Sequence, residues 1–125
     1  MVSLAGESDR VFKTAWFSKA ARKAHIPDSE LCAAIRQVML GQADDLGGGV
    51  FKKRLGKNLY RSIIVARGGW YWVYAYLFAK SDQANIGADE LAEFRDLAAL
   101  YSWKTDADVA KELKLKELVE ICHEN

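Results

Sequence analysis

A stretch of basic residues with no acidic neighbour is the clearest chemical feature of this 125-residue chain. Residues 49–80 hold seven lysines and arginines and no aspartate or glutamate. They are Lys52, Lys53, Arg54, Lys57, Arg61, Arg67 and Lys80. Residues 1–48 carry six acidic and six basic residues, whereas residues 81–125 carry eleven acidic and five basic ones. Although the net charge is only +1, this uneven distribution is typical of a protein with one face that meets a polyanion.

Aromatic residues are interleaved with these cations. They are Tyr60, Trp70, Tyr71, Trp72, Tyr74 and Tyr76. Cations neutralise phosphates and rings stack on unpaired bases, so the combination favours single-stranded RNA over a duplex. The competing interpretation is a solvated sheet face whose rings pack in the core. That interpretation suits Trp72, Tyr74 and Tyr76 better than Tyr60 and Trp70, which lie beside predicted turns.

Known enzyme motifs are missing from the sequence, which has no phosphate loop, dinucleotide fingerprint or hydrolase elbow. The two cysteines, Cys32 and Cys122, and the two histidines, His25 and His123, lack zinc-ligand spacing, so we expect no metal and no cofactor. Two cysteines are also too few for a disulfide framework, and we expect both to be small buried hydrophobes. Metal-free cleavage of RNA is still chemically feasible, because a positioned cation stabilises a pentavalent phosphate while other side chains move protons.

Hydrophobic spacing predicts the elements that position these residues. Strands are predicted over residues 12–17, 50–55, 60–67, 70–79 and 118–122. Helices are predicted from Ser18 to Pro27, from Asp28 or Ser29 to Gly41, from Asp89 through Tyr101, and over residues 106–113. Residues 42–49 are predicted to be a loop. The order β-α-α-β-β-β-α, with a further C-terminal strand, predicts an α+β domain with one antiparallel sheet.

The dipeptide Gly68-Gly69 predicts a tight hairpin turn. The expected register pairs Arg67 with Trp70, Val65 with Trp72, Ile63 with Tyr74 and Arg61 with Tyr76. Because side chains alternate along a strand, Lys52 and Arg54 should share one face, with Lys53 on the other. We expect the acid-rich helix after residue 88 to pack on the opposite sheet face and leave the basic face open.

The length and the 50% hydrophobic content indicate a single domain over residues 1–125, with residues 1–10 as a loose N-terminal segment. No stretch of about 18 uncharged apolar residues occurs, so a membrane span is excluded. The first ten residues also lack the order of a signal peptide, and we expect a cytoplasmic protein.

Several short motifs carry a family resemblance over residues 10–125. They are Phe51-Lys52-Lys53-Arg54-Leu55, Tyr60-Arg61-Ser62-Ile63-Ile64, Leu77-Phe78-Ala79-Lys80-Ser81, Asn85-Ile86, Asp89-Glu90-Leu91 and the ending from Glu117 to Glu124. In this order they resemble toxins of type II toxin–antitoxin modules in the RelE/ParE superfamily, in the HigB-like branch. The Phe-Ala-Lys motif followed by Asn-Ile is the most specific part.

The resemblance implies ribosome-dependent cleavage of messenger RNA and a neighbouring antitoxin, typically a helix-turn-helix protein, that covers the basic face. Arg61 and Lys80 would contact the phosphate or its transition state. Lys52, Lys53, Arg54 and Lys57 would hold messenger or ribosomal RNA, with Arg67, Tyr60 and Trp70 as further contacts.

Two departures from the family pattern leave alternatives open. The segment from Gly56 to Tyr60 is shorter than the loop in many relatives, and neither His123 nor Tyr101 matches the C-terminal acid or base of RelE-type toxins. The superfamily also includes gyrase poisons that do not cut RNA. A gyrase-targeting toxin and a non-toxic RNA-binding module are therefore the competing hypotheses.

Overall fold

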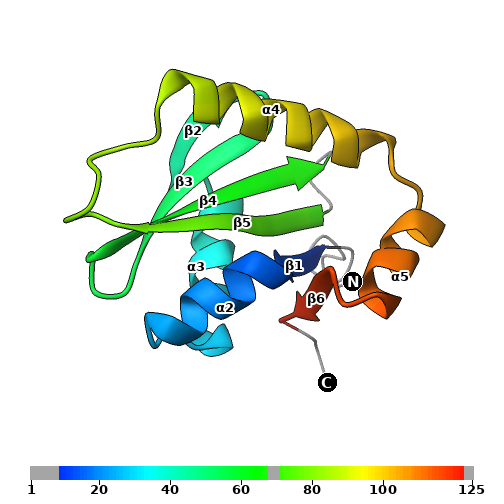
Figure 1. Cartoon of the computed structure of the whole chain (residues 1–125), viewed down its shortest axis with the longest axis horizontal. Helices are drawn as coiled ribbons and strands as arrows, with labels where there is room; N and C mark the ends of the chain where they lie inside the picture. Colours follow the sequence, from blue (N-terminus) through cyan, green and yellow to red (C-terminus); the bar gives the residue numbers. More distant parts are fainter. Residues whose placement is uncertain (1–8, 68–70, 123–125) are drawn as a thin grey trace.

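The computed structural model describes residues 9–67 and 71–122 of the chain. Its elements are β1 (Arg10–Thr14), α2 (Ala15–Lys23), α3 (Asp28–Met39), β2 (Asp44–Gly47), β3 (Val50–Leu55), β4 (Tyr60–Arg67), β5 (Tyr71–Ala79), α4 (Ala88–Trp103), α5 (Asp106–Lys114) and β6 (Leu118–Ile121). The strands form one sheet in the order β2-β3-β4-β5-β1-β6. Helix α4 runs along one face of this sheet, and α2 and α3 lie on the other (Figure 1). The predicted α+β class is confirmed.

A hydrophobic core lies on each side of the sheet. One contains Phe17, Leu31 and Ile35 from α2 and α3, packed on Ile64 and Tyr74. The other packs α4 and α5 against Phe12, Val50, Ile63, Val65, Val73 and Phe78. Every central strand therefore has apolar side chains on both faces, as the sequence of β4 and β5 predicts.

The first strand ends earlier than the sequence predicts. Thr14 is the N-cap of α2, and its hydroxyl accepts a hydrogen bond from the Phe17 amide at 3.0 Å. The predicted strand over 12–17 is therefore correct only for residues 12–14, and the predicted cap at Ser18 is wrong. Thr14 satisfies a free amide at the helix start, and Phe17 is fully buried as a helical residue.

The helices with regular apolar spacing are confirmed. In α3 the buried residues are Leu31, Ala34, Ile35 and Val38. In α4 the predicted stripe of Leu91, Phe94, Leu97, Ala98 and Tyr101 packs against the sheet. The expectation that this helix packs on the sheet face opposite the cations is wrong. Its apolar stripe covers Val50, Ile63 and Val65.

The register of the β4–β5 hairpin differs from the prediction. The predicted turn Gly68-Gly69 and the predicted strand residue Trp70 lie outside the described residues. Arg67 pairs with Tyr71 instead of Trp70, so the observed pairing is shifted by one residue. An irregularity between Ile63 and Ile64 shifts it again. The observed pairs are Val65 with Val73, Ile63 with Tyr76, and Arg61 with Phe78.

Two strand pairings have no signal in the local sequence. Residues predicted to be a loop include β2, an exposed edge strand that pairs with β3 and places Asp44 opposite Lys52. Strand β1 pairs in parallel with β5 and antiparallel with β6. The parallel pairing brings the N-terminal strand into the sheet beside the hairpin, so the prediction of a wholly antiparallel sheet is wrong for this strand.

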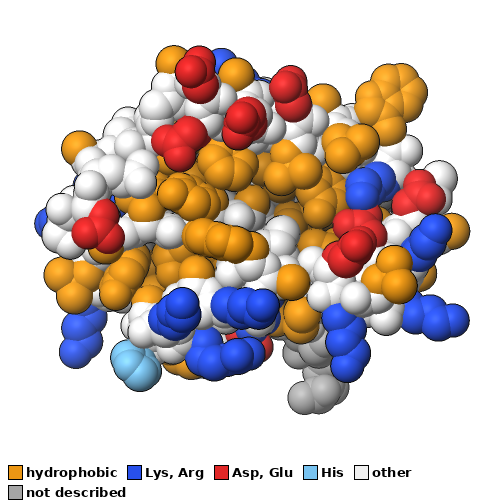
Figure 2. Space-filling view, viewed as in Figure 1, with side chains coloured by type: hydrophobic (Ala, Val, Ile, Leu, Met, Phe, Trp, Pro, Cys, Tyr) orange, Lys and Arg blue, Asp and Glu red, His pale blue; other side chains and the backbone are white. Residues whose placement is uncertain are grey.

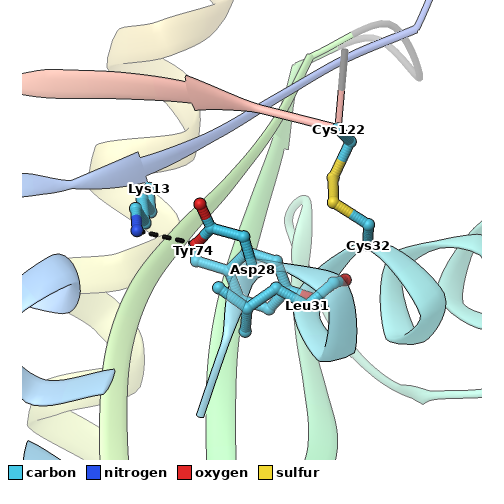
Figure 3. Close-up of a disulfide and its surroundings, with 6 residues drawn as sticks. All are labelled: Lys13, Asp28, Leu31, Cys32, Tyr74 and Cys122. Atoms are coloured by element: carbon cyan, nitrogen blue, oxygen red, sulfur yellow. Dashed lines mark hydrogen bonds and ion pairs between the residues drawn. A yellow bond between two sulfur atoms is a disulfide. The ribbon is translucent and has the colours of Figure 1, made fainter. Parts of the chain in front are cut away.

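Cys32 and Cys122 form a disulfide, with their Cα atoms 5.4 Å apart (Figure 3). The prediction that both are unpaired apolar residues is therefore wrong. Cys32 lies in α3 and Cys122 directly follows β6, and the pairing of β6 with β1 brings these distant segments together. Nearby, the Lys13 ammonium contacts the Asp28 carboxylate at 2.7 Å, which links β1 to the start of α3.

Within the described residues, no helix is long and apolar enough to cross a membrane.

Candidate functional site

Three of the predicted cations lie together on one face of the sheet. Arg54 of β3 pairs directly with Arg61 of β4, and Lys52 pairs with Ile63. Ile63 belongs to the core under α4, so alternation places all three cations on that face. We call Lys52, Arg54 and Arg61 the basic cluster. Helix α4 covers the other half of the same face, over Val50 and Val65.

Lys52 is the most restrained member of the basic cluster. Its ammonium group donates a hydrogen bond to Asn85 Oδ1 at 3.2 Å and lies 3.6 Å from Asp44 Oδ2. The side chain of Lys52 is 16% exposed, whereas that of Asp44 is 69% exposed. The connection between β5 and α4 thus holds one cation in place through Asn85.

Arg61 is fixed by its own turn. Its Nη1 group donates to the carbonyl oxygens of Asn58 and Tyr60, both at 3.1 Å. Neither Arg61 nor the exposed Arg54 has a carboxylate within salt-bridge distance among the described residues. Because a guanidinium has five N–H donors, Arg61 keeps donors that can bind an anion.

The other predicted cations lie around the basic cluster. Lys80 follows β5, two residues after Phe78, the partner of Arg61, and its side chain is exposed. Lys57 is exposed in the turn between β3 and β4. Lys53 points away from the cluster and donates to the Gln42 carbonyl at 2.8 Å. Burial and, secondarily, the charge of Arg54 lower the pKa of Lys53 below its usual value.

Two predicted contacts are separated from the cluster or cannot be placed. Arg67 lies at the opposite end of β4, about 20 Å from Arg61 along the strand. The side chain of Arg67 and all of Trp70 lie outside what the structure describes. The seven predicted cations therefore do not form one continuous patch.

The aromatic residues divide between the core and an open cleft. Trp72 and Tyr74 are buried, and the Tyr74 hydroxyl donates to the Leu31 carbonyl at 2.7 Å (Figure 3). Burial raises the pKa of the Tyr74 phenol well above its usual value. Tyr60 and Tyr76 instead line a cavity of about 500 Å³. Both rings are half-buried, and the core position expected for Tyr76 is confirmed in part, because its ring also packs on Phe78 and Phe94.

This cavity, the edge cleft, lies between α2 and the end of β5. Its lining consists of Trp16, Lys19, Ala20, Lys23, Tyr60, Tyr76, Leu77, Phe78, Ala79, Asp82 and Gln83. Trp16, Lys19 and Lys23 are absent from the predicted site, because Trp16 is expected in a strand. Once Thr14 is identified as the N-cap, the spacing of these three residues by three and four positions predicts that they share one face of a helix.

Charged side chains of opposite sign gather along opposite borders of this face. Figure 2 shows carboxylates along α4, lysines and arginines along the α2 side, and hydrophobic side chains between them. The acid-rich helix and the basic side of α2 thus lie on one surface, separated by apolar side chains.

Neither Tyr101 nor His123, the two side chains compared with the C-terminal acid or base of RelE-type toxins, is placed in an open site. Tyr101 is 5% exposed in α4, and burial raises the pKa of its phenol to about 12. His123 lies outside the described residues. Tyr101 is therefore part of the core and not of an open site. In the described part of the chain, no group of three or more His, Cys, Asp or Glu side chains could hold a metal ion.

Residues 9–121 match the family model of the RelE toxin of the RelE/RelB toxin–antitoxin system. Searches among curated proteins and among solved structures found no match. The family match covers every element from β1 to β6.

Proposed function

Because the chain belongs to the RelE toxin family of toxin–antitoxin systems, we propose that it is a metal-independent endoribonuclease that cuts messenger RNA on the ribosome. We place it in the HigB-like branch on the motifs around Lys80 and Asn85. Its expression without an antitoxin would stop translation.

The pairing of Arg54 with Arg61 is the observation that carries this proposal. Like charges directly opposite each other destabilise a sheet, so their presence favours a role in binding an anion. An RNA phosphate beside both guanidinium groups would relieve the repulsion. Lys52 lies on the same face and adds a third positive charge.

The proposed reaction is an internal transfer at phosphorus. The ribose 2′-oxygen forms a bond to the adjacent phosphorus, and the bond from phosphorus to the 5′-oxygen breaks. The 2′-hydroxyl loses its proton to a base, and the 5′-oxygen gains a proton, which leaves a 2′,3′-cyclic phosphate and a 5′-hydroxyl. Negative charge builds on the phosphate oxygens, where Arg61 and Lys80 act as the stabilising cations.

The remaining predicted residues would hold the RNA. Lys52 and Arg54 lie beside Arg61 and contact the backbone near the cleaved phosphate. Lys57 and Lys53 contact messenger or ribosomal RNA further from the cleaved phosphate. Each contact between one of these cations and a phosphate weakens as the salt concentration rises. The ribosome would hold the RNA in line for attack, because the basic cluster consists only of lysine and arginine side chains.

An antitoxin is the second proposed partner. It would be a helix-turn-helix protein that covers the basic cluster with acidic or apolar segments. The same cations would then bind RNA in the free toxin and the antitoxin in the complex.

Induced expression tests the proposal. We expect growth arrest and messenger fragments with new ends inside ribosome-bound reading frames. The double variant Arg61→Ala/Lys80→Ala should remove both effects. The control variant Arg22→Ala/Lys111→Ala removes the same charge outside the site and should stay toxic. DNA damage signalling with intact messenger RNA would instead identify a gyrase-targeting toxin, and RNA binding without arrest would identify a non-toxic binding module.

A further inference from the structure

The edge cleft exists because a neighbouring strand ends early. Strand β1 pairs with β5 only from Arg10 to Lys13, opposite Tyr71 to Tyr74. After Thr14 the chain turns into α2, so the last part of β5 has no β1 residue beside it. The cleft opens at this unpaired edge, between α2 and Tyr76–Ala79.

Helix α2 presents a ring and two cations to the cleft. Trp16, Lys19 and Lys23 follow each other at intervals of three and four residues, so they share one face of the helix. Trp16 is 50% exposed, so a large part of its apolar surface is open to solvent. Arg22, on another face of α2, lines a different cavity with His25.

A row of rings connects the cleft to the basic cluster. Trp16 stacks on Tyr76, with ring centres 5.0 Å apart and planes inclined by 24°. Tyr76 also contacts Phe78 at 5.9 Å, and Phe78 is the strand partner of Arg61. A nucleic acid strand bound at Arg61 would therefore reach the cleft along an aromatic surface.

We propose that the edge cleft is a nucleobase-binding site for an unpaired base of the RNA strand held by the basic cluster, an inference that rests on the proposed function. Trp16 and Tyr60 would provide stacking surfaces for the base, and Lys19 and Lys23 would neutralise the phosphates next to it. The cavity of about 500 Å³ is large enough for one nucleotide. Asp82 and Gln83, which also line the cleft, supply polar groups that can hydrogen-bond to a base edge.

A protein segment is the competing occupant, and the observations favour RNA. The cleft combines stacked rings with lysines and continues into a surface of arginines, which is the composition of a single-strand nucleic acid groove. Among the lining residues that the structure describes, Asp82 is the only carboxylate beside two lysines, so their summed charge is positive.

The test uses a short single-stranded RNA that carries 2-aminopurine, a base that loses fluorescence when it stacks. The full-length protein should quench it on binding, at low salt. Trp16→Ala should weaken RNA binding by about tenfold and abolish the quenching. Trp16→Phe keeps an aromatic ring and should retain both the RNA binding and the quenching. Lys19→Ala/Lys23→Ala should reduce the slope of log K against log salt by about 1.4.

Two matched controls separate this site from general effects. Trp103→Ala removes a tryptophan that is 84% exposed at the end of α4, and Lys111→Ala/Lys114→Ala removes two charges from α5. Both should bind and quench like the wild type, and circular dichroism should show that all variants are folded.

The outcomes also separate the inference from the proposed function. If the wild type does not quench the probe, or if Trp16→Ala quenches it fully, the nucleobase site is wrong even if ribosome-bound messenger RNA is still cut. If Trp16→Ala binds RNA normally and only antitoxin binding is lost, the cleft is a protein-binding site and the inference is overturned. If neither the wild type nor any variant cleaves messenger RNA but the wild type still quenches the probe, the proposed endoribonuclease activity is rejected and the base-binding site is retained.

Discussion

Arg54 and Arg61 lie directly opposite each other on neighbouring antiparallel strands, and no carboxylate of the described residues forms a salt bridge with either of them. The Arg61 guanidinium is held by the carbonyls of Asn58 and Tyr60. The sheet therefore places two positive charges close together.

This pair predicts opposite effects on stability and on activity. Replacing Arg54 by Gln removes the repulsion, so the free energy of unfolding should stay the same or rise by about 0.2–1 kcal/mol. Cleavage of ribosome-bound messenger RNA should fall by about tenfold or more, because a charge-assisted phosphate contact is lost. Urea unfolding and a cleavage time course measure the two effects. Arg36→Gln, on the exposed side of α3, is the matched control and should change neither. Destabilisation of more than about 1 kcal/mol would contradict the argument.

Asp44 should limit the affinity of the basic cluster for RNA. Its carboxylate lies 3.6 Å from the Lys52 ammonium but is 69% exposed, so the pair contributes less than about 1 kcal/mol to stability. Asp44→Asn should therefore raise the affinity for single-stranded RNA about two- to fivefold at low salt and leave the thermal midpoint almost unchanged. Fluorescence anisotropy measures the affinity. Glu117→Gln makes the same charge change near β6, at the other edge of the sheet, and an equal gain there would show a general charge effect.

The disulfide should make stability depend on redox conditions. Cys32 and Cys122 are 90 residues apart in the sequence, so the bond restricts a long loop in the unfolded chain. Its loss should lower the free energy of unfolding by roughly 2–5 kcal/mol. Urea unfolding with and without a reductant measures this difference. The variant Cys32→Ser/Cys122→Ser should have the same urea midpoint with and without the reductant. A wild-type midpoint that does not change with the reductant would refute the prediction.

Tyr101 should make the protein sensitive to alkaline pH. Burial, and secondarily the charge of Glu112, raises the pKa of its phenol from 10.0 to about 12. The folded state then binds more protons than the unfolded state between these values. The stabilisation is present below pH 10 and is lost as the pH rises towards 12. Tyr101→Phe should flatten the fall in stability between pH 10 and 12. Chemical unfolding at each pH measures this stability. An equally steep fall in the variant would contradict this assignment.

Local periodicity explains the parts of the fold that the sequence predicts correctly. Helices α3 and α4 each carry an apolar stripe at helical spacing, and this stripe is the face that is buried. Alternation likewise places Lys52 and Arg54 together and Lys53 apart, as the strand pairing confirms. These features depend only on neighbours in the chain.

The features that the sequence does not predict depend on competition or on distant partners. Thr14 fits a strand by alternation, but its hydroxyl caps α2, and this moves Trp16 into the helix and forms the edge cleft. The hairpin register changes at an irregularity next to Ile63. The Cys32–Cys122 bond requires β6 to lie beside β1, a pairing between the two ends of the chain.

The covalent link between α3 and the segment after β6 makes residues 32–122 a closed ring. A protease that cuts once in the exposed connection between β5 and α4 would open this ring without releasing a fragment. The nicked molecule would migrate as one band on a non-reducing gel and as two bands after reduction. A toxin built in this way could be clipped and still keep both halves of its sheet together.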